Sequence, residues 1–322
     1  MMSHHSRTLL LIGCAVTAYL LVRDDVSWLD TYTIIGIYAL LALSVGLSYG
    51  QAGILSVAQA AFASIGAYAT AILTARYNLS PAVGLLAAVV VPALVAYPLA
   101  RVVTGLSPLA LAIATLVFGQ AIDVGLRQGG DFTGGYIGLS GIPAVPYFSS
   151  AGTFALLTWG FVALVVFFYE NLLATSYGRA IATIRVDALR ATADGVNIVH
   201  LRSAVLALSA SIAGLAGWLY AHHISYVGPD SLNPSVSLSV LLMAVIGGAR
   251  TVLGPVVGAA LLTIAITILP AQEMQGMFYG ATLIVVLLLA PTGLLGALPP
   301  LSMIFRRRAS TAQHGEPDRR QA

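Results

Sequence analysis

The sequence predicts an all-α polytopic integral membrane protein with about ten (nine or ten) transmembrane helices and both termini in the cytoplasm. Composition, the spacing of apolar runs and the distribution of arginine carry this prediction. The 322 residues are 58% hydrophobic and 8% charged, and their mean hydropathy is +0.91. A soluble chain is about 25% charged. So few charges cannot cover a water-facing surface, and so much apolar area excludes a disordered chain.

Apolar windows long enough to cross a membrane recur along the chain, since a spanning helix needs about 20 apolar residues. The windows lie at approximately 8–22, 29–49, 53–74, 81–99, 106–125, 154–170, 203–221, 237–248, 254–269 and 277–296. The first and eighth are short and could be tilted or re-entrant, which leaves nine spans open.

The first window resembles a signal peptide, because Arg7 precedes an apolar run that reaches a cleavage-box-like Cys14. The run continues to Val22, so we expect an uncleaved first helix.

Arginine placement predicts the orientation. With ten spans and cytoplasmic termini, twelve arginines fall inside: Arg7, Arg101, Arg179, Arg185, Arg190, Arg202, Arg250, Arg306, Arg307, Arg308, Arg319 and Arg320. Only Arg23, Arg76 and Arg127 fall outside. We expect one transmembrane domain over residues 1–305, with an external loop at about 126–153 and a cytoplasmic loop at about 171–202. The basic tail 306–322 is expected to be cytoplasmic and disordered.

Several kinds of chemistry are excluded. Cys14 is the sole cysteine and the chain has no lysine, which excludes an intramolecular disulfide, a cysteine metal cluster and a Walker A lysine. No HExxH or GxSxG motif marks an intramembrane enzyme. No metal site is expected at His222 and His223, because adjacent side chains on a helix diverge by about 100°.

Ion coupling usually needs ionisable groups inside the membrane. The candidates Asp123, Glu170, His222 and His223 all lie near the ends of spans. We expect them to be solvated or snorkelling termini, which disfavours an ion-coupled secondary transporter.

Small residues recur every fourth position at Ala63, Ala67 and Ala71, at Ser209, Ala213 and Gly217, and at Gly254 and Gly258. Such faces are typical of tight helix packing, and they could also line a path or join a second subunit. Two glycine-rich interruptions, 49–53 and 247–255, are more informative, because broken helices often mark a translocation path.

The cytoplasmic loop has local helix signals. Residues 179–186 can form one helix, Asp187 can cap a second, and Gly195 can end it. The second helix is too short to be stable alone. It either packs on its own bundle or docks against a cytoplasmic partner, with arginines near anionic headgroups or the partner's acidic rim.

In order and spacing, several blocks resemble the permease subunits of ABC importers for branched-chain amino acids, on the M side of the Liv system. The resemblance runs from about Leu41 to Gly296. The matching blocks are 50–53, 55–56, 59–62, 65–68, 133–135, 138–143, 178–180, 187, 195–197, 213–217, 219–223, 229–231, 241–243, 247–248 and 254–255. The sequence departs from the family pattern at Ile54, Ala58, Ala188, Thr192, Ser239, Arg250 and Ala290.

The resemblance implies an uptake subunit of the bacterial inner membrane that is not an enzyme and holds no cofactor or metal. Its partners would be the lipid bilayer, a homologous LivH-like permease, two ATPase subunits (LivG-like and LivF-like) that bind ATP and Mg²⁺, and a periplasmic substrate-binding protein; no nucleic acid is implied. The substrate would be leucine, isoleucine or valine; urea or a small aromatic acid is the alternative, because Ser239 replaces a glutamate common in relatives.

The resemblance also assigns two sets of residues. The loop that couples to the ATPases would use Gly178, Arg179, Arg185, Asp187, Ala188, Ala191, Gly195 and Asn197. The translocation path would use Gly50, Gly53, Ser56, Gln59, Tyr68, Ser239, Gly247 and Gly248.

Overall fold

The computed structural model describes residues 6–103, 105–268 and 293–295. The helices in chain order are α1 (Ser6–Val22), α2 (Val26–Val45), the π-helical η1 (Gly46–Gln51), α3 (Gln59–Ala71), the π-helical η2 (Ile72–Arg76), α4 (Pro81–Val103), α5 (Pro108–Gln128), α6 (Gly130–Thr133), α7 (Ala151–Ala174), α8 (Ser176–Val186), α9 (Ala188–Ala193), α10 (Ile198–Ile224), the 3₁₀ turn η3 (Pro229–Leu232), α11 (Pro234–Gly247) and α12 (Gly254–Ile268). Two short strands, β1 (Leu139–Ser140) and β2 (Tyr226–Val227), pair antiparallel with Leu139 opposite Val227.

Polar residues just before the apolar runs start the long helices, since a side-chain oxygen at this position accepts from an otherwise unpaired backbone N–H. Asp25 accepts from the N–H of Ser27 at 2.9 Å to cap α2. Asn197 accepts from the N–H of His200 at 3.0 Å to cap α10. Ser107, Ser150 and Asn233 cap α5, α7 and α11 in the same way.

Within the described residues, six helical stretches are long and apolar enough to cross a membrane: 26–51, 81–103, 108–128, 151–174, 198–224 and 229–247. Two shorter apolar helices, α1 and α12, match the predicted first and ninth spans. The structure is therefore that of an all-α, multi-pass membrane protein. The predicted tenth span, 277–296, lies outside the described residues except for 293–295.

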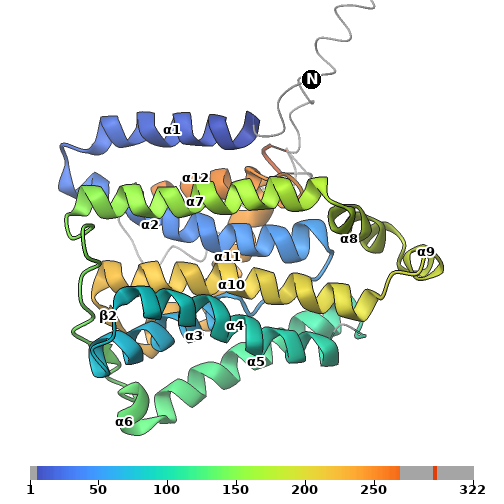
Figure 1. Cartoon of the computed structure of the whole chain (residues 1–322), viewed down its shortest axis with the longest axis horizontal. Helices are drawn as coiled ribbons and strands as arrows, with labels where there is room; N and C mark the ends of the chain where they lie inside the picture. Colours follow the sequence, from blue (N-terminus) through green and yellow to red (C-terminus); the bar gives the residue numbers. More distant parts are fainter. Residues whose placement is uncertain (1–5, 104, 269–292, 296–322) are drawn as a thin grey trace, which may run out of the picture.

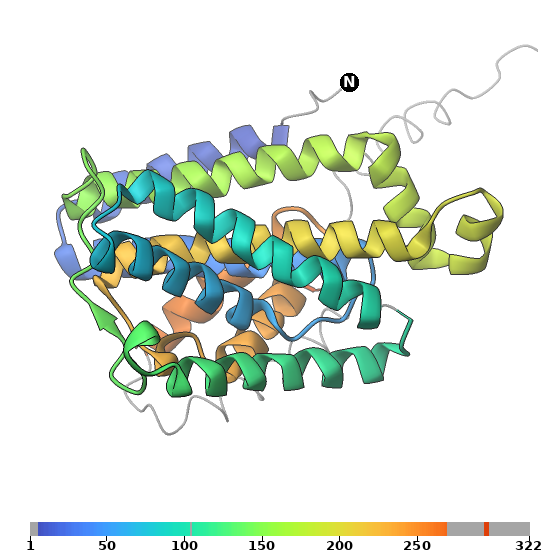
Figure 2. The ribbon, with the colours of Figure 1, turned by 60° about the horizontal axis from the view of Figure 1, so that its bottom comes forward.

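The long helices run side by side along one axis (Figure 1). α10 packs against α3 and α4, while α2 packs against α7, α10 and α12. The α8–α9 hairpin projects from one end of this bundle, and β1, β2 and α6 lie at the opposite end (Figures 1 and 2). We call these the α8–α9 end and the β1–β2 end.

Small residues bring helices into direct backbone contact, as the sequence predicts. Ala63, Ala67 and Ala71 of α3 are fully buried. A Cβ added at Gly217 of α10 would overlap the backbone of Ala63, and one at Gly258 of α12 would overlap the backbone of α11. The prediction of tight packing at these faces is confirmed.

The predicted helix 53–74 is wrong over its first six residues. Gly53 has a φ of +69°, a value that side chains disfavour, and the chain turns back there along η1. The N–H of Ile54 donates to the carbonyl of Ser48 at 2.9 Å. α3 begins only at Gln59, whose side chain is fully buried. The third apolar run is therefore a half-helix that starts inside the bundle.

Candidate functional site

The loop between α7 and α10 forms two helices, in agreement with the prediction for 179–195. Thr175 Oγ1 accepts from the N–H of Gly178 at 3.3 Å, so α8 starts earlier than predicted. Asp187 then has the extended backbone of a helix cap between α8 and α9. Gly195, with a φ of +81°, ends α9 and donates its N–H to the carbonyl of Thr192 at 3.0 Å. Asn197 caps α10 directly after it.

The turn from α7 into α8 depends on Gly178. A Cβ there would lie 2.5 Å from the carbonyl oxygen of Leu172 and 2.6 Å from the backbone of Leu173, which is closer than real Cβ contacts. The turn is therefore tight, and α8 is directly connected to the end of α7.

The hairpin buries some predicted contact residues and exposes others. Ala191 is fully buried, so it is not free for a partner's groove. Ala188 lies in α9 beside it. Val186 is 87% exposed at the end of α8, and Arg179 is exposed nearer its start. An apolar side chain this exposed beside arginines gives the hairpin a surface that a partner could cover.

Arg185 connects this hairpin to the first glycine-rich interruption. Its Nη1 donates to the carbonyl oxygen of Gly50. Its Cγ lies close to Gly53, since a Cβ added to that glycine would be 3.4 Å from it. Burial lowers the pKa of the Arg185 guanidinium, and the nearby charge of Arg250 lowers it further. An arginine stays protonated at neutral pH even so, so a partly buried cation joins α8 to η1.

The two glycine-rich interruptions meet at this point. A Cβ on Gly50 would overlap the carbonyl oxygen of Ala249, and Gln51 Nε2 donates to the carbonyl of Arg250 at 2.9 Å. Gly248 ends α11 with a φ of +107°. Glycine is required at residue 50 because the two backbones touch. We call Gly50, Gly53, Arg185, Ala249 and Arg250 the junction.

Farther into the bundle, a cluster of buried polar side chains surrounds the start of α3. Gln59 Nε2 donates to Ser209 Oγ at 3.1 Å and to Ser48 Oγ at 3.3 Å. Its Oε1 accepts from Ser44 Oγ at 3.1 Å. All four side chains are fully buried. The cluster ties α2, α3 and α10 together at one level and satisfies the amide in this conformation.

Two hydroxyls from other helices complete the break before α3. Thr115 Oγ1 of α5 accepts from the N–H of Val57 at 3.0 Å, and Ser237 Oγ of α11 accepts from the N–H of Ala60 at 2.9 Å. Ser56 is buried and accepts from the N–H of Ala58 at 3.4 Å. Sequence reasoning missed Thr115 and Ser237; a hydroxyl inside an apolar span was their only signal.

Comparisons with known proteins agree with this architecture. Residues 27–287 match the family described as "Branched-chain amino acid transport system / permease component". The chain belongs to this family. It is 28% identical to the high-affinity branched-chain amino acid transport system permease protein LivM of Escherichia coli (strain K12), over 84% of this chain and 70% of that protein. It is 21% identical to the probable branched-chain amino acid transport permease protein LivM of Methanocaldococcus jannaschii, over 85% of this chain and 94% of that protein. No solved structure matches it significantly.

The remaining predicted path residues of this permease lie apart from the cluster. Tyr68, on α3, is buried, and its hydroxyl has no hydrogen-bond partner among the described residues. Ser239, on α11, is partly exposed and donates to its own helix at the carbonyl of Ser235. Gly247 packs on the backbone of Gly254, where a Cβ would not fit. The structure thus joins Gly50 and Gly53 to the junction and Ser56 and Gln59 to the break, but leaves Tyr68 and Ser239 separate.

The permease buries ionisable groups at its β1–β2 end that the sequence predicted to be solvated. Asp123 is 15% exposed and pairs with Arg127 at 3.0 Å, which also binds Asp230 at 2.7 Å. His222 is buried, and its Nδ1 lies 2.8 Å from the carbonyl oxygen of Pro143. The expectation of solvated termini is wrong here, because the loop 129–150 and η3 fold back over the helix ends.

The histidines and the acidic residue of α7 have separate partners. His223 Nε2 lies 2.8 Å from Asp30 of α2, away from the partner of His222. Near the other end, Glu170 accepts from Thr8 Oγ1 at 2.6 Å and ties α7 to α1. These contacts hold the bundle together at positions where the sequence showed only scattered charges.

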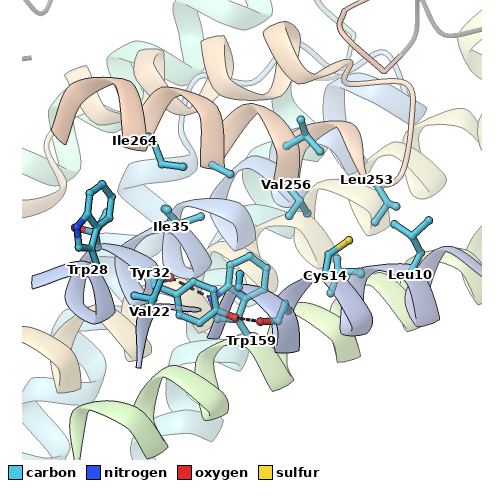
Figure 3. Close-up of a pocket in the computed structure, with 16 residues that line it drawn as sticks. Leu10, Cys14, Val22, Trp28, Tyr32, Ile35, Trp159, Leu253, Val256 and Ile264 are labelled. Atoms are coloured by element: carbon cyan, nitrogen blue, oxygen red, sulfur yellow. Dashed lines mark hydrogen bonds between the residues drawn. The ribbon is translucent and has the colours of Figure 1, made fainter. Parts of the chain in front are cut away.

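An apolar cavity of about 380 Å³ lies between α1, α2, α7 and α12. Figure 3 shows Leu10, Ile35, Val256 and Ile264 pointing into it. The Tyr32 hydroxyl is already bound to the carbonyl of Ala15 at 2.7 Å. A zwitterionic solute needs polar partners when it leaves water, so this cavity does not suit an amino acid.

Proposed function

We propose that this permease is the transmembrane subunit of an ABC importer that moves leucine, isoleucine and valine across the bacterial inner membrane. The family and the names of its relatives support the substrate class. A homologous LivH-like permease would complete the pore, and a periplasmic binding protein would deliver the substrate. LivG-like and LivF-like subunits would bind ATP and Mg²⁺ and hydrolyse the ATP, so this chain is a transport component and not an enzyme.

The observation that carries the proposal is the Arg185–Gly50 contact. A movement of α8, driven by ATPase subunits below it, reaches η1 through this one hydrogen bond. From η1 it reaches the α11–α12 turn through Gln51 and Arg250. In this mechanism a single hairpin moves both glycine-rich interruptions, which glycine backbones permit at low cost.

Access to the pore would change at the break before α3. The N–H of Val57 in the break and the N–H of Ala60 in the first turn of α3 donate to hydroxyls of α5 and α11 and not to their own helix. Such an N–H can exchange one acceptor for another without unwinding a helix. Gln59 and its serines would then present polar groups to a passing amino acid. Discontinuous helices with these features are typical of transport paths.

The test uses the reconstituted complex of all subunits. Arg185→Gln should lower substrate-stimulated ATP hydrolysis at least fivefold, because the charge-assisted bond to Gly50 is lost. Arg101→Gln is the matched control, since Arg101 is an exposed arginine in the last turn of α4. This turn lies toward the same end of the bundle as α8 (Figure 1). Binding of substrate to the periplasmic protein should not change. Wild-type stimulation in Arg185→Gln would rule out this transmission route.

Substrate identity is tested separately, by uptake of labelled leucine, isoleucine and valine into proteoliposomes that hold ATP. Competition by urea or by an aromatic acid, without competition by valine, would favour the alternative solutes. Uptake that an ionophore abolishes while ATP remains intact would indicate an ion-coupled carrier instead.

A further inference from the structure

A second apolar groove runs between α4, α7 and α10, and the transport mechanism above does not use it. Its cavity has a volume of about 570 Å³. Leu208 and Ile212 of α10 lie in its floor, Leu164 and Phe168 of α7 form one wall, and Leu86 of α4 forms the other. Figure 1 shows α10 between α7 and α4.

Apart from Ser211 in its floor, the polar residues that line the groove lie toward its α8–α9 end. Asn171 and Thr175 line it there, whereas Leu85, Phe161 and Leu215 line the part nearer the middle of the bundle. Within the described part of the chain, the Asn171 amide has no hydrogen-bond partner. The one hydroxyl in the floor, Ser211, already donates to the carbonyl of Ala207 on its own helix. This lining suits an amphiphile whose polar end lies beside α8.

The positively charged Arg179 lies beside the polar end of the groove. The backbone N–H of Arg179 donates to the carbonyl of Thr175, which lines the groove. The guanidinium folds back toward α7, with Nη1 3.5 Å from the carbonyl of Ala174. Arg179 is exposed, so its remaining N–H groups can reach an anion at the end of the groove. Arginine binds phosphate oxygens with two parallel hydrogen bonds.

The length of the groove matches one leaflet of a bilayer. From Phe161 to Thr175 it follows α7 for fourteen residues, which at 1.5 Å per residue is about 21 Å. A bilayer is about 40–45 Å thick with its headgroups, so one leaflet is about 20–22 Å deep.

We propose that this groove binds an acyl chain of an anionic phospholipid from the leaflet on the α8–α9 side, with the phosphate at Arg179 and Asn171. The lipid would fill the space between α4 and α7, which make few direct contacts, and would rest against the first turn of α8. None of the residues that line the cavity of Figure 3 is charged, so that cavity carries no such assignment.

The experiment uses the assembled importer in phosphatidylcholine vesicles that contain a small fraction of phosphatidylglycerol with a photoreactive acyl chain. No substrate or ATP is added, so the result does not depend on the proposed transport activity. Wild type should be labelled on α7 and α10, and should retain phosphatidylglycerol when analysed by native mass spectrometry. Leu208→Trp, which fills the groove from a position that is 44% exposed, should lower both signals about fivefold. Val117→Trp, at a 60% exposed position on α5, is the control and should leave both unchanged.

The headgroup is tested by Arg179→Gln and Asn171→Leu. Each should reduce the preference for phosphatidylglycerol over phosphatidylcholine several-fold. If Leu208→Trp does not purify as a single species, Asn171→Leu decides, because it is close to isosteric. Uniform labelling of all helices, labelling blocked by a partner subunit's helix, or unchanged lipid retention in these variants would overturn the proposal.

Discussion

At Gly50 of this permease there is no room for even a single additional carbon atom. Its Cα faces the carbonyl oxygen of Ala249, and a Cβ would occupy the same space. On α7, Gly160 has nothing within 4 Å of a Cβ position. The structure therefore excludes a side chain at residue 50 and leaves room for one at residue 160, although the sequence alone does not distinguish the two glycines.

Gly50→Ala should lower the free energy of unfolding by about 1–3 kcal/mol, because an overpacked contact must be relieved by backbone movement. Gly160→Ala should raise it by about 0.5–1 kcal/mol, since glycine is unfavourable within a helix. Unfolding of the two purified variants by sodium dodecyl sulfate, followed by circular dichroism, measures both. Equal effects of the two substitutions would contradict the close approach at the junction.

At the scale of elements, local sequence signals predicted the α8–α9 hairpin, whereas contacts between residues far apart in the sequence form the break before α3, which the sequence did not predict. The Asp187 and Gly195 signals act within a few residues, so the sequence located the end of α9 correctly. Residues 53–58 are mostly apolar and contain no proline, which favours a continuous helix. Two residues far away in the sequence stabilise the break: Thr115 accepts from the N–H of Val57, and Ser237 accepts from the N–H of Ala60 in the first turn of α3. No local pattern contains that information.

The hairpin should depend on the conformation of Gly195 more than on its size. With a φ of +81° and open space around it, the position suits glycine and tolerates asparagine, but strains a β-branched residue. Gly195→Val should reduce substrate-stimulated ATP hydrolysis by the reconstituted complex at least fivefold. Gly195→Asn should retain most of it.

Both variants should keep the helices folded, because the hairpin projects from the end of the bundle (Figure 1). Their circular dichroism and their elution as a single species check this. If Gly195→Val couples as well as Gly195→Asn, the hairpin does not transmit movement, and a loop that only packs on its own bundle is the better interpretation.

At the scale of the whole molecule, composition predicted the class and the spacing of apolar runs predicted most helices. The described structure reproduces the windows at 29–49, 81–99, 106–125, 154–170 and 203–221 as helices whose bounds differ by a few residues. The partners of buried charges were not predictable, because Arg127 reaches Asp230 across 103 residues. Which end faces the cytoplasm stays a prediction that rests on arginine.

Orientation is tested by single cysteines in a Cys14→Ala background. Cys14 lines an apolar cavity next to Ala15 and Ala18, so a methyl group there should be tolerated. Ser149 lies exposed in the loop at the β1–β2 end, and Ser310 lies in the basic tail. The arginine bias predicts that the α8–α9 end and the tail face the cytoplasm. Ser149→Cys should therefore react with an impermeant maleimide in intact cells. Ser310→Cys should react only after the cells are permeabilised. The reverse pattern would show that the chain has the opposite orientation in the membrane. The α8–α9 hairpin with Arg179 and Arg185 would then lie on the side of the membrane that has no ATP, where ATPase subunits could not move it.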